Sequence, residues 1–168
     1  IGSLLGAAAA FFGGWVDHVV IWLYTTLASI PYLVLLVVLA YAFSGMVLRL
    51  DLFGRPMSVD VGSTLLPVYV ALCATFWIGP CRVIRGETLK IKQLEYVQAA
   101  TATGFSRTYI LVRHILPNAA HLMLINFSLL FIGAVKSEVI LSFLGLGVKK
   151  GPSWGIMISH SAQEVVNG

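Results

Sequence analysis

The side chains best suited to metal or redox chemistry are scattered along this chain of 168 residues. Imidazoles bind transition metals when several of them converge. The histidines instead lie in separate segments, at His18, His114, His121 and His160. Cys73 and Cys81 lie beside one apolar run without a Cys-x-x-Cys spacing, which is typical of small packing residues. We therefore expect no metal site in this chain.

Catalytic chemistry is not expected either. A hydrolase inside a membrane would need a nucleophile with a base, or paired carboxylates, within an apolar segment. The sequence contains no His-Glu-x-x-His and no paired aspartates in an apolar run. It also lacks the glycine-rich loop ending in Lys-Ser/Thr that holds nucleotide phosphates. We predict no catalytic residue and no bound cofactor.

The composition is that of a membrane protein. Hydrophobic residues make up 58% of the chain and charged residues only 11%, against about 25% charged in soluble domains. Mean hydropathy is +0.91. These values exclude a disordered chain, a disulfide scaffold and an ordinary soluble domain. The net charge of +4 rests on 11 basic residues, too few for a nucleic-acid surface.

Long runs without charge predict an all-α, polytopic membrane fold with about four to five transmembrane helices. A helix needs about 20 apolar residues to cross the hydrocarbon layer. We expect spans over residues 1–16, 19–41, 61–81 and 115–135. The first of these is only part of a span, and the second is kinked at Pro31. Residues 139–148 form a shorter helix extension or interfacial segment, and residues 149–168 a polar tail. We expect one domain over 1–168, truncated at both ends because an apolar run opens it without Met.

The distribution of charge predicts the orientation in the membrane. Residues 82–117 carry six basic and two acidic side chains and so account for the whole net charge of +4. The positive-inside rule places this connection in the cytoplasm, together with residues 13–18. Residues 42–60, whose charges sum to zero, and the tail then lie outside. Lys149 and Lys150 run against this assignment without reversing it.

The cytoplasmic connection is patterned. Leu94, Val97 and Ala100 recur every three residues and so share one face of a helix. Gly104 is placed to end that helix in a left-handed cap, and Ser106 to cap the next helix. Such a short amphipathic helix either lies flat on the lipid surface or inserts into a groove on a cytoplasmic partner. Its small side chains favour the groove.

Several motifs resemble the permeases of ABC importers. Residues 95–104 (Glu-Tyr-Val-Gln-Ala-Ala-Thr-Ala-Thr-Gly) and 113–118 (Arg-His-Ile-Leu-Pro-Asn) resemble the EAA loop of that family. The dipeptide, oligopeptide and nickel branch of the family is resembled by residues 1–6, 13–17, 141–147 and 152–155. Of the two permeases in such importers, the chain resembles the second, C-type subunit. One departure is that Gln98 stands where the pattern has its first Glu. Glu95, one turn earlier, could supply that charge.

The resemblance implies a function and a set of partners. Residues 82–117 would hold the coupling helix, which docks on a cytoplasmic ATPase through Glu95, Gln98, Ala99, Ala100, Thr103 and Gly104. The partners would be a paralogous permease, two ATPase subunits carrying ATP and Mg, and an extracytoplasmic binding protein. This chain would be a multi-pass subunit in the bacterial inner membrane. The cargo would be di- or oligopeptides, with nickel or another small solute as the alternative. A passive channel, which would need rings of charges or carbonyls, and a membrane-embedded enzyme are further alternatives.

Polar residues on apolar spans are candidates for a pore or gate. Asn126 and Ser128 could line the pore or form hydrogen bonds between helices. Glu138 could gate or contact substrate, or pair with Lys136 at the interface. Finally, Gly2 and Gly6 form a small-residue face that either allows tight helix packing or reflects the ordinary abundance of glycine in spans.

Overall fold

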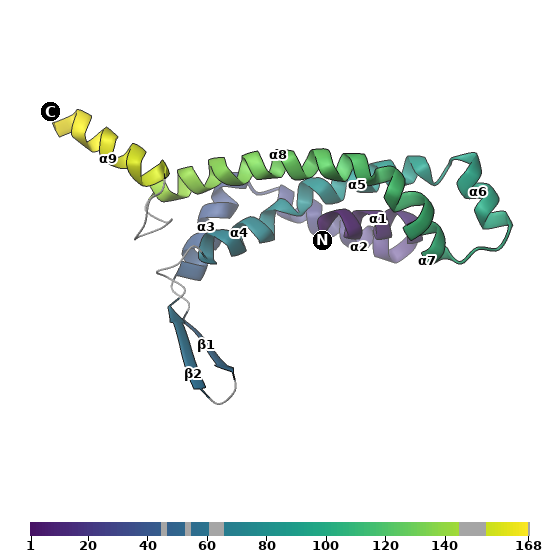
Figure 1. Cartoon of the computed structure of the whole chain (residues 1–168), viewed down its shortest axis with the longest axis horizontal. Helices are drawn as coiled ribbons and strands as arrows, with labels where there is room; N and C mark the ends of the chain where they lie inside the picture. Colours follow the sequence, from purple (N-terminus) through teal and green to yellow (C-terminus); the bar gives the residue numbers. More distant parts are fainter. Residues whose placement is uncertain (45–46, 53–54, 61–65, 145–153, 168) are drawn as a thin grey trace. The chain divides into compact units, whose positions relative to one another are not determined.

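A computed structural model describes residues 1–44, 47–52, 55–60, 66–144 and 154–167 (Figure 1). The chain divides into two compact units. Unit 1 contains residues 1–30 and 76–130, and unit 2 contains residues 31–75 and 131–168. The prediction of a helical, polytopic membrane fold is confirmed. The extent of the permease domain stays a prediction.

Unit 1 is helical throughout its described residues. Its elements are α1 (Gly2–Phe12), α2 (Gly14–Ala28), α5 (Ile78–Ile91), α6 (Glu95–Ala102), α7 (Arg107–Ile110), the π-helical turn η2 (Leu111–Ile115) and the first part of α8 (Leu116–Phe143). The most extensive packing is between α1 and α5.

Glycines set the distance between α1 and α5. A Cβ atom on Gly2 would lie 2.2 Å from the carbonyl oxygen of Trp77, and one on Gly6 2.2 Å from that of Cys81. Both distances are far below van der Waals contact, so only glycine permits this approach of the two backbones. The tight-packing interpretation of the Gly2-x-x-x-Gly6 pattern is therefore confirmed, and abundance alone does not explain it.

The core of unit 1 joins the helices α1 and α5 to the segment between α5 and α8. Phe11 of α1 and Ile84 of α5 belong to the same buried cluster as Val97 of α6 and Ile110 of α7. Ile84, Ile110 and Ile115 are each at most 1% exposed. Because one cluster includes all these elements, the short helices α6 and α7 are held against α1 and α5.

Unit 2 contains α3 (Tyr32–Ser44), the strands β1 (Val47–Leu52) and β2 (Arg55–Asp60), α4 (Leu66–Phe76), the end of α8 and α9 (Trp154–Asn167). The helix α9 replaces most of the expected polar tail. A Cβ atom on Gly155 would lie 2.5 Å from the Cβ of Ser142, so α9 begins in close contact with α8. The turn expected at residues 151–154 lies mostly outside the described residues.

A β-hairpin is the main addition to the all-α prediction. Figure 1 shows the strands β1 and β2 side by side. They are antiparallel, and Leu52 pairs with Arg55. Residues 47–52 (Val-Leu-Arg-Leu-Asp-Leu) have a leucine at every second position, so the three leucines share one face of a strand. Pro56 is tolerated because both strands are edges.

The spans differ in their limits from those expected. By length and composition, Val68–Ile91 and Arg107–Phe143 can cross a membrane, and α2 with α3 would make a third span if the pair counts as one. The kinked span expected over residues 19–41 is divided in the structure, because α2 ends at Ala28 and α3 begins after Pro31, and the two helices make one span only if a broken span is counted. The short apolar helix Gly2–Phe12 occupies the expected partial span. Residues 139–143 extend α8, as one of the two interpretations proposed.

Candidate functional site

The candidate site is the segment between α5 and α8, where α6 is seated by its buried face. Val97 is 2% exposed and Ala100 is 8% exposed, and both belong to the core cluster of unit 1. Leu94 precedes α6 as its N-cap residue and is 46% exposed. The predicted apolar stripe is therefore correct for two of its three residues. That stripe is covered by the chain itself, so it is not free to contact lipid or a partner.

The other faces of α6 are open to solvent. Of the six residues predicted to dock, five are exposed: Glu95, Gln98, Ala99, Thr103 and Gly104. Ala100 is instead buried, so the structure places it beneath the helix. Ala102 is exposed on the same face as Glu95 and Ala99, because residues three and four apart are neighbours on a helix. The sequence analysis did not single out Ala102, although helical periodicity could have.

Gly104 ends α6 in the left-handed conformation, as predicted, with φ of 83°. The amide of Gly104 donates to the carbonyl of Thr101 at 3.1 Å, and that of Phe105 to the carbonyl of Ala100 at 3.2 Å. These two bonds form a Schellman motif, which satisfies carbonyls at the end of the helix. A left-handed residue is strained for any side chain with a Cβ. The chain can reverse here without strain because the residue is glycine.

The next helix starts immediately after this turn. Ser106 is the N-cap of α7, and its hydroxyl accepts a hydrogen bond from the amide of Tyr109 at 3.3 Å, which confirms the predicted cap. The rings of Phe105 and Tyr109 stack at 5.1 Å between centroids. From Arg107 the helix runs through η2 into α8 and on to Phe143, as one apolar helix of 37 residues. The Gly104 turn therefore connects α6 to the beginning of this long helix.

A hydrogen bond between side chains connects α6 to α8. Asn118 of α8 donates to the hydroxyl of Tyr96 at 2.9 Å and to the carbonyl of His114 at 2.6 Å. The rings of Tyr96 and His114 lie 6.1 Å apart. The sequence analysis quoted Tyr96 and Asn118 only as parts of motifs and predicted no contact between them, since they lie 22 residues apart.

An ion pair fixes the start of α2 to α5. Arg85 donates from Nε to Asp17 Oδ1 at 2.6 Å and from Nη2 to Oδ2 at 2.7 Å. Both side chains are partly buried, with exposures of 20% and 15%. Bidentate pairs of this kind are geometrically specific. The sequence analysis counted Arg85 among the charges of residues 82–117 and quoted Asp17 within the motif of residues 13–17, and it predicted no contact between them.

The candidate pore residues are engaged in local hydrogen bonds. The Asn126 amide donates to the carbonyl of Leu122 at 2.8 Å, and the Ser128 hydroxyl to that of Leu124 at 3.2 Å. Glu138 accepts from Ser142 at 2.6 Å. Glu138 is ten or more residues from the other two along α8, which is about 15 Å at 1.5 Å per residue. The three are not brought together, and their role in a pore stays a prediction.

A further polar contact lies near Glu138 in unit 2. The hydroxyl of Tyr32, at the start of α3, is hydrogen-bonded to Ser137 of α8. Ser137 itself donates to the carbonyl of Gly133 at 2.8 Å, so the Tyr32 hydroxyl acts as the donor to Ser137. This contact joins α3 to α8 within unit 2.

Comparison with known proteins identifies the family. The sequence model described as "Binding-protein-dependent transport system inner membrane component" matches residues 2–163. The chain belongs to this family. The resemblance deduced from the EAA-like and terminal motifs is thereby confirmed, as is the inner-membrane location that the family's description states.

Curated members of the family resemble the chain over most of its length. It is 31% identical over 166 residues to the oligopeptide transport system permease protein OppC of Haemophilus influenzae, covering 98% of the chain and 48% of the relative. It is 31% identical to the dipeptide transport system permease protein DppC of Bacillus subtilis, over 100% of the chain and 47% of the relative. OppC of Escherichia coli is 32% identical, over 91% and 45%. The chain spans about half the length of these relatives.

Two sequence features bear on other functions. Residues 151–155 read Gly-Pro-Ser-Trp-Gly, which fits the Gly-x-Ser-x-Gly pattern of serine hydrolases, although we expected no catalytic motif in this chain. In hydrolases that serine lies on a turn between a strand and a helix. Residue 153 is outside the described residues, so the pattern stays a match in sequence alone. Among the described residues, no group of three or more His, Cys, Asp or Glu side chains could hold a metal ion.

Proposed function

We propose that this chain is part of the transmembrane permease subunit of an ATP-driven ABC importer whose cargo is di- or oligopeptides. Family membership over residues 2–163 is the observation that carries the proposal. The cargo is inferred from the printed names of the relatives, which are oligopeptide and dipeptide permeases. The chain is a transport subunit and not an enzyme in this proposal.

The coupling step would use the exposed face of α6. Glu95, Ala99 and Gln98 would contact a cleft on a cytoplasmic ATPase that holds ATP and Mg. The buried residues Val97 and Ala100 would keep the helix seated on its own subunit. A movement of the ATPase would then pass through the Gly104 turn and α7 into the long helix that ends at Phe143.

The rest of the assembly follows from the same proposal. A paralogous permease would complete the pore, two ATPase subunits would bind the two permeases, and an extracytoplasmic binding protein would deliver the cargo. The permease chain itself would hold no cofactor. Its exposed apolar side chains on α8, such as Leu124 and Phe127, each 69% exposed, would face lipid or the second permease.

The test is purification of the full-length protein in mild detergent, with identification of every protein that accompanies it. We expect two nucleotide-binding subunits and a second permease. Reconstituted into vesicles with the binding protein, the complex should accumulate labelled peptides when ATP is supplied. Accumulation of nickel instead of peptides would overturn the cargo. A chain that purifies alone, even after crosslinking, would overturn the importer assignment.

A further inference from the structure

A cavity of about 530 Å³ lies between the end of α1, α6 and α7 in unit 1. Its volume is within the range of roughly 300–1,000 Å³ that is usual for ligand sites. One part of its wall is apolar and includes Phe11, Phe12, Val97 and Phe105. The other part carries two basic side chains, Lys92 and Arg107. No residue that lines this cavity is acidic.

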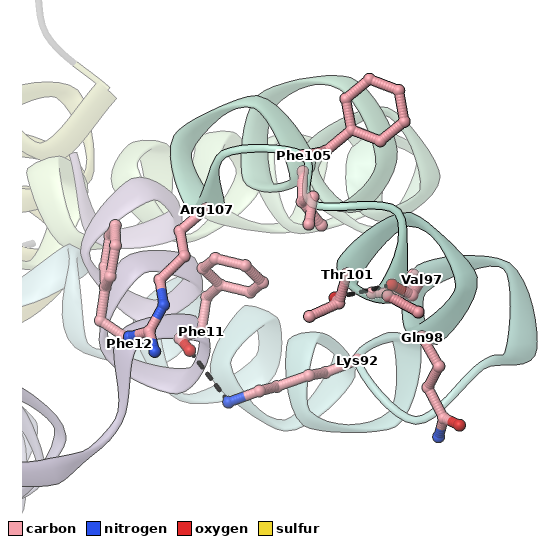
Figure 2. A pocket seen from close by; sticks show the side chains of 10 residues that line it. Phe11, Phe12, Lys92, Val97, Gln98, Thr101, Phe105 and Arg107 are labelled. Carbon is pink, nitrogen blue, oxygen red and sulfur yellow. Dashed lines mark hydrogen bonds between the residues drawn. The ribbon is translucent and has the colours of Figure 1, made fainter.

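The two cations approach the same end of α1 from different elements. Figure 2 shows Arg107 reaching from α7 toward Phe11 and Phe12, while Lys92 approaches from the end of α5. The Lys92 ammonium donates to the carbonyl of Phe11 at 2.9 Å and lies 5.7 Å from the centre of its ring. The Lys92 ammonium is therefore held at the cavity by the end of α1, and the exposed Arg107 side chain reaches toward the same end.

Neither cation is neutralised by the chain. Among the described residues the ion pairs are Arg85 with Asp17 and Lys90 with Glu87, and neither includes Lys92 or Arg107. The nearby carboxylate of Asp17 forms its ion pair with Arg85, through one hydrogen bond to each of its oxygens. Two uncompensated cations facing one cavity favour an anion with several acceptor oxygens, such as a phosphate group.

The apolar wall adds a second requirement. A free phosphate ion would use the cations and leave the phenylalanine rings unused, whereas an amphiphile would use both. Exposed aromatic residues such as Trp15, 83% exposed, and Phe12, 43% exposed, lie at the same end of α1 and are typical of a membrane–water interface. Basic pockets between helices on the cytoplasmic side of membranes bind anionic lipid headgroups.

We propose that this cavity binds an anionic phospholipid, with its phosphate between Lys92 and Arg107 and the start of its acyl chains against Phe11, Phe12 and Phe105. The lipid would join α1 to α5, α6 and α7, the elements that position the proposed coupling face. Coupling between ATP hydrolysis and transport would then depend on anionic lipid in the cytoplasmic leaflet. The lipid site uses the membrane placement of the family and does not require any particular cargo.

The experiment measures lipid retained by the full-length subunit, purified with its partner subunits and passed through vesicles with or without phosphatidylglycerol. Retention is compared between the unaltered complex and the variant that combines Lys92→Gln with Arg107→Gln. Losing even one charge-assisted hydrogen bond should reduce retention at least about tenfold. Lys90→Gln is the matched control, since Lys90 is on the same helix, its side chain is 78% exposed, and it does not line the cavity.

Further arms separate the source of the anion and protect against misfolding. Arg107→Lys keeps the charge and should retain lipid, so loss in the double variant together with retention in this one supports the site. Equal retention in all variants would overturn it. Displacement of the lipid by inorganic phosphate alone would overturn the lipid in favour of a free anion. Disulfide crosslinks between an Arg107→Cys variant and a cysteine introduced on an ATPase subunit, formed with an added oxidant, would assign the cavity to that protein instead.

The proposal can fail without the importer. Co-purification of the ATPase subunits and peptide accumulation are measured on the same preparations. If these persist while lipid retention is the same in every variant, only the lipid site is overturned. If the ATPase subunits never accompany the chain, the importer assignment fails, whatever lipid the cavity retains.

Discussion

Arg85 and Asp17 join α5 to the start of α2 across a separation of 68 residues in the sequence. Both oxygens of the carboxylate are used, and both side chains are four-fifths or more buried. Lys90 and Glu87, by contrast, form a pair in which the Lys90 side chain is 78% exposed. Among the described residues, α5 therefore takes part in one partly buried ion pair, with α2, and in one more exposed pair within the helix itself.

Removing one partner of the buried pair should destabilise the protein. Arg85→Ala or Asp17→Ala leaves a partly buried charge without its hydrogen bonds, which costs about 1–3 kcal/mol. The double variant should lose less than the sum of the two, because the residues interact directly. Thermal unfolding in detergent measures this. Lys90→Ala is the control and should change stability by less than about 1 kcal/mol. Strictly additive losses would contradict a direct interaction.

The glycine at the α1–α5 contact should be intolerant of a single methyl group. In Gly6→Ala the new Cβ would lie 2.2 Å from the Cys81 carbonyl oxygen, so the helices must separate. Overpacking of this kind costs about 1–3 kcal/mol. Gly79→Ala on α5 meets nothing within 4 Å and should be neutral or slightly stabilising. Equal unfolding temperatures for the two variants would show that the backbones do not approach this closely.

The turn after α6 should tolerate glycine and little else. Gly104→Val places a β-branched residue at φ of 83°, which is strained although no atom lies within 4 Å of the new Cβ. The strain should bend the link between α6 and α7, so transport should be abolished while the protein remains in the membrane. Gly86→Ala, in the open surroundings of α5, is the control. Normal uptake by Gly104→Val would refute the proposal that movement of the ATPase passes through this turn into the long helix.

The turn and its caps were predictable because they depend on neighbours in sequence. Gly104 and Ser106 have the side chains that a left-handed cap and an N-cap demand, and the structure places them so. The three-residue spacing found the buried face of α6 at Val97 and Ala100. It included Leu94 wrongly, because periodicity does not show where a helix begins.

The remaining features depend on contacts between distant residues. The pairing of Asp17 with Arg85 and of Tyr96 with Asn118 requires the fold, and no local pattern announces it. The kink at Pro31 was expected, but hydropathy alone did not show that α2 already ends at Ala28, and it missed the helix α9. The alternation in residues 47–52 was a usable signal for a strand, but a search for charge-free runs does not detect it.

Restoring the acidic residue of the EAA-like pattern should not harm coupling. Gln98 is exposed and donates to the Gln93 carbonyl at 3.0 Å, a bond that Glu cannot make. At an exposed position this loss is small, and the new carboxylate regains the charge that the family pattern offers to the ATPase. Peptide transported per ATP hydrolysed should be unchanged or higher in Gln98→Glu, with Gln93→Glu as the control. A clear decrease would mean that the amide makes a contact specific to its own ATPase.

The orientation of the chain is open to a direct labelling test. Lys90→Cys places a thiol near the end of α5 at an exposed site, in a background where Cys73 and Cys81 are changed to Ala. A membrane-impermeant maleimide should label it in inside-out vesicles and not in intact cells, because residues 82–117 carry the net positive charge. Ser58→Cys, in β2, should give the opposite result.

The outcome decides more than topology. Labelling of Lys90→Cys from outside would place α6 away from any cytoplasmic ATPase. It would also move the cavity at Lys92 and Arg107 to the outer leaflet, so both proposals would fail together. Labelling from the cytoplasmic side, with Ser58→Cys reactive only outside, leaves the exposed face of α6 on the side where ATP is available. The lipid site would then lie in the leaflet whose anionic headgroups attract basic residues.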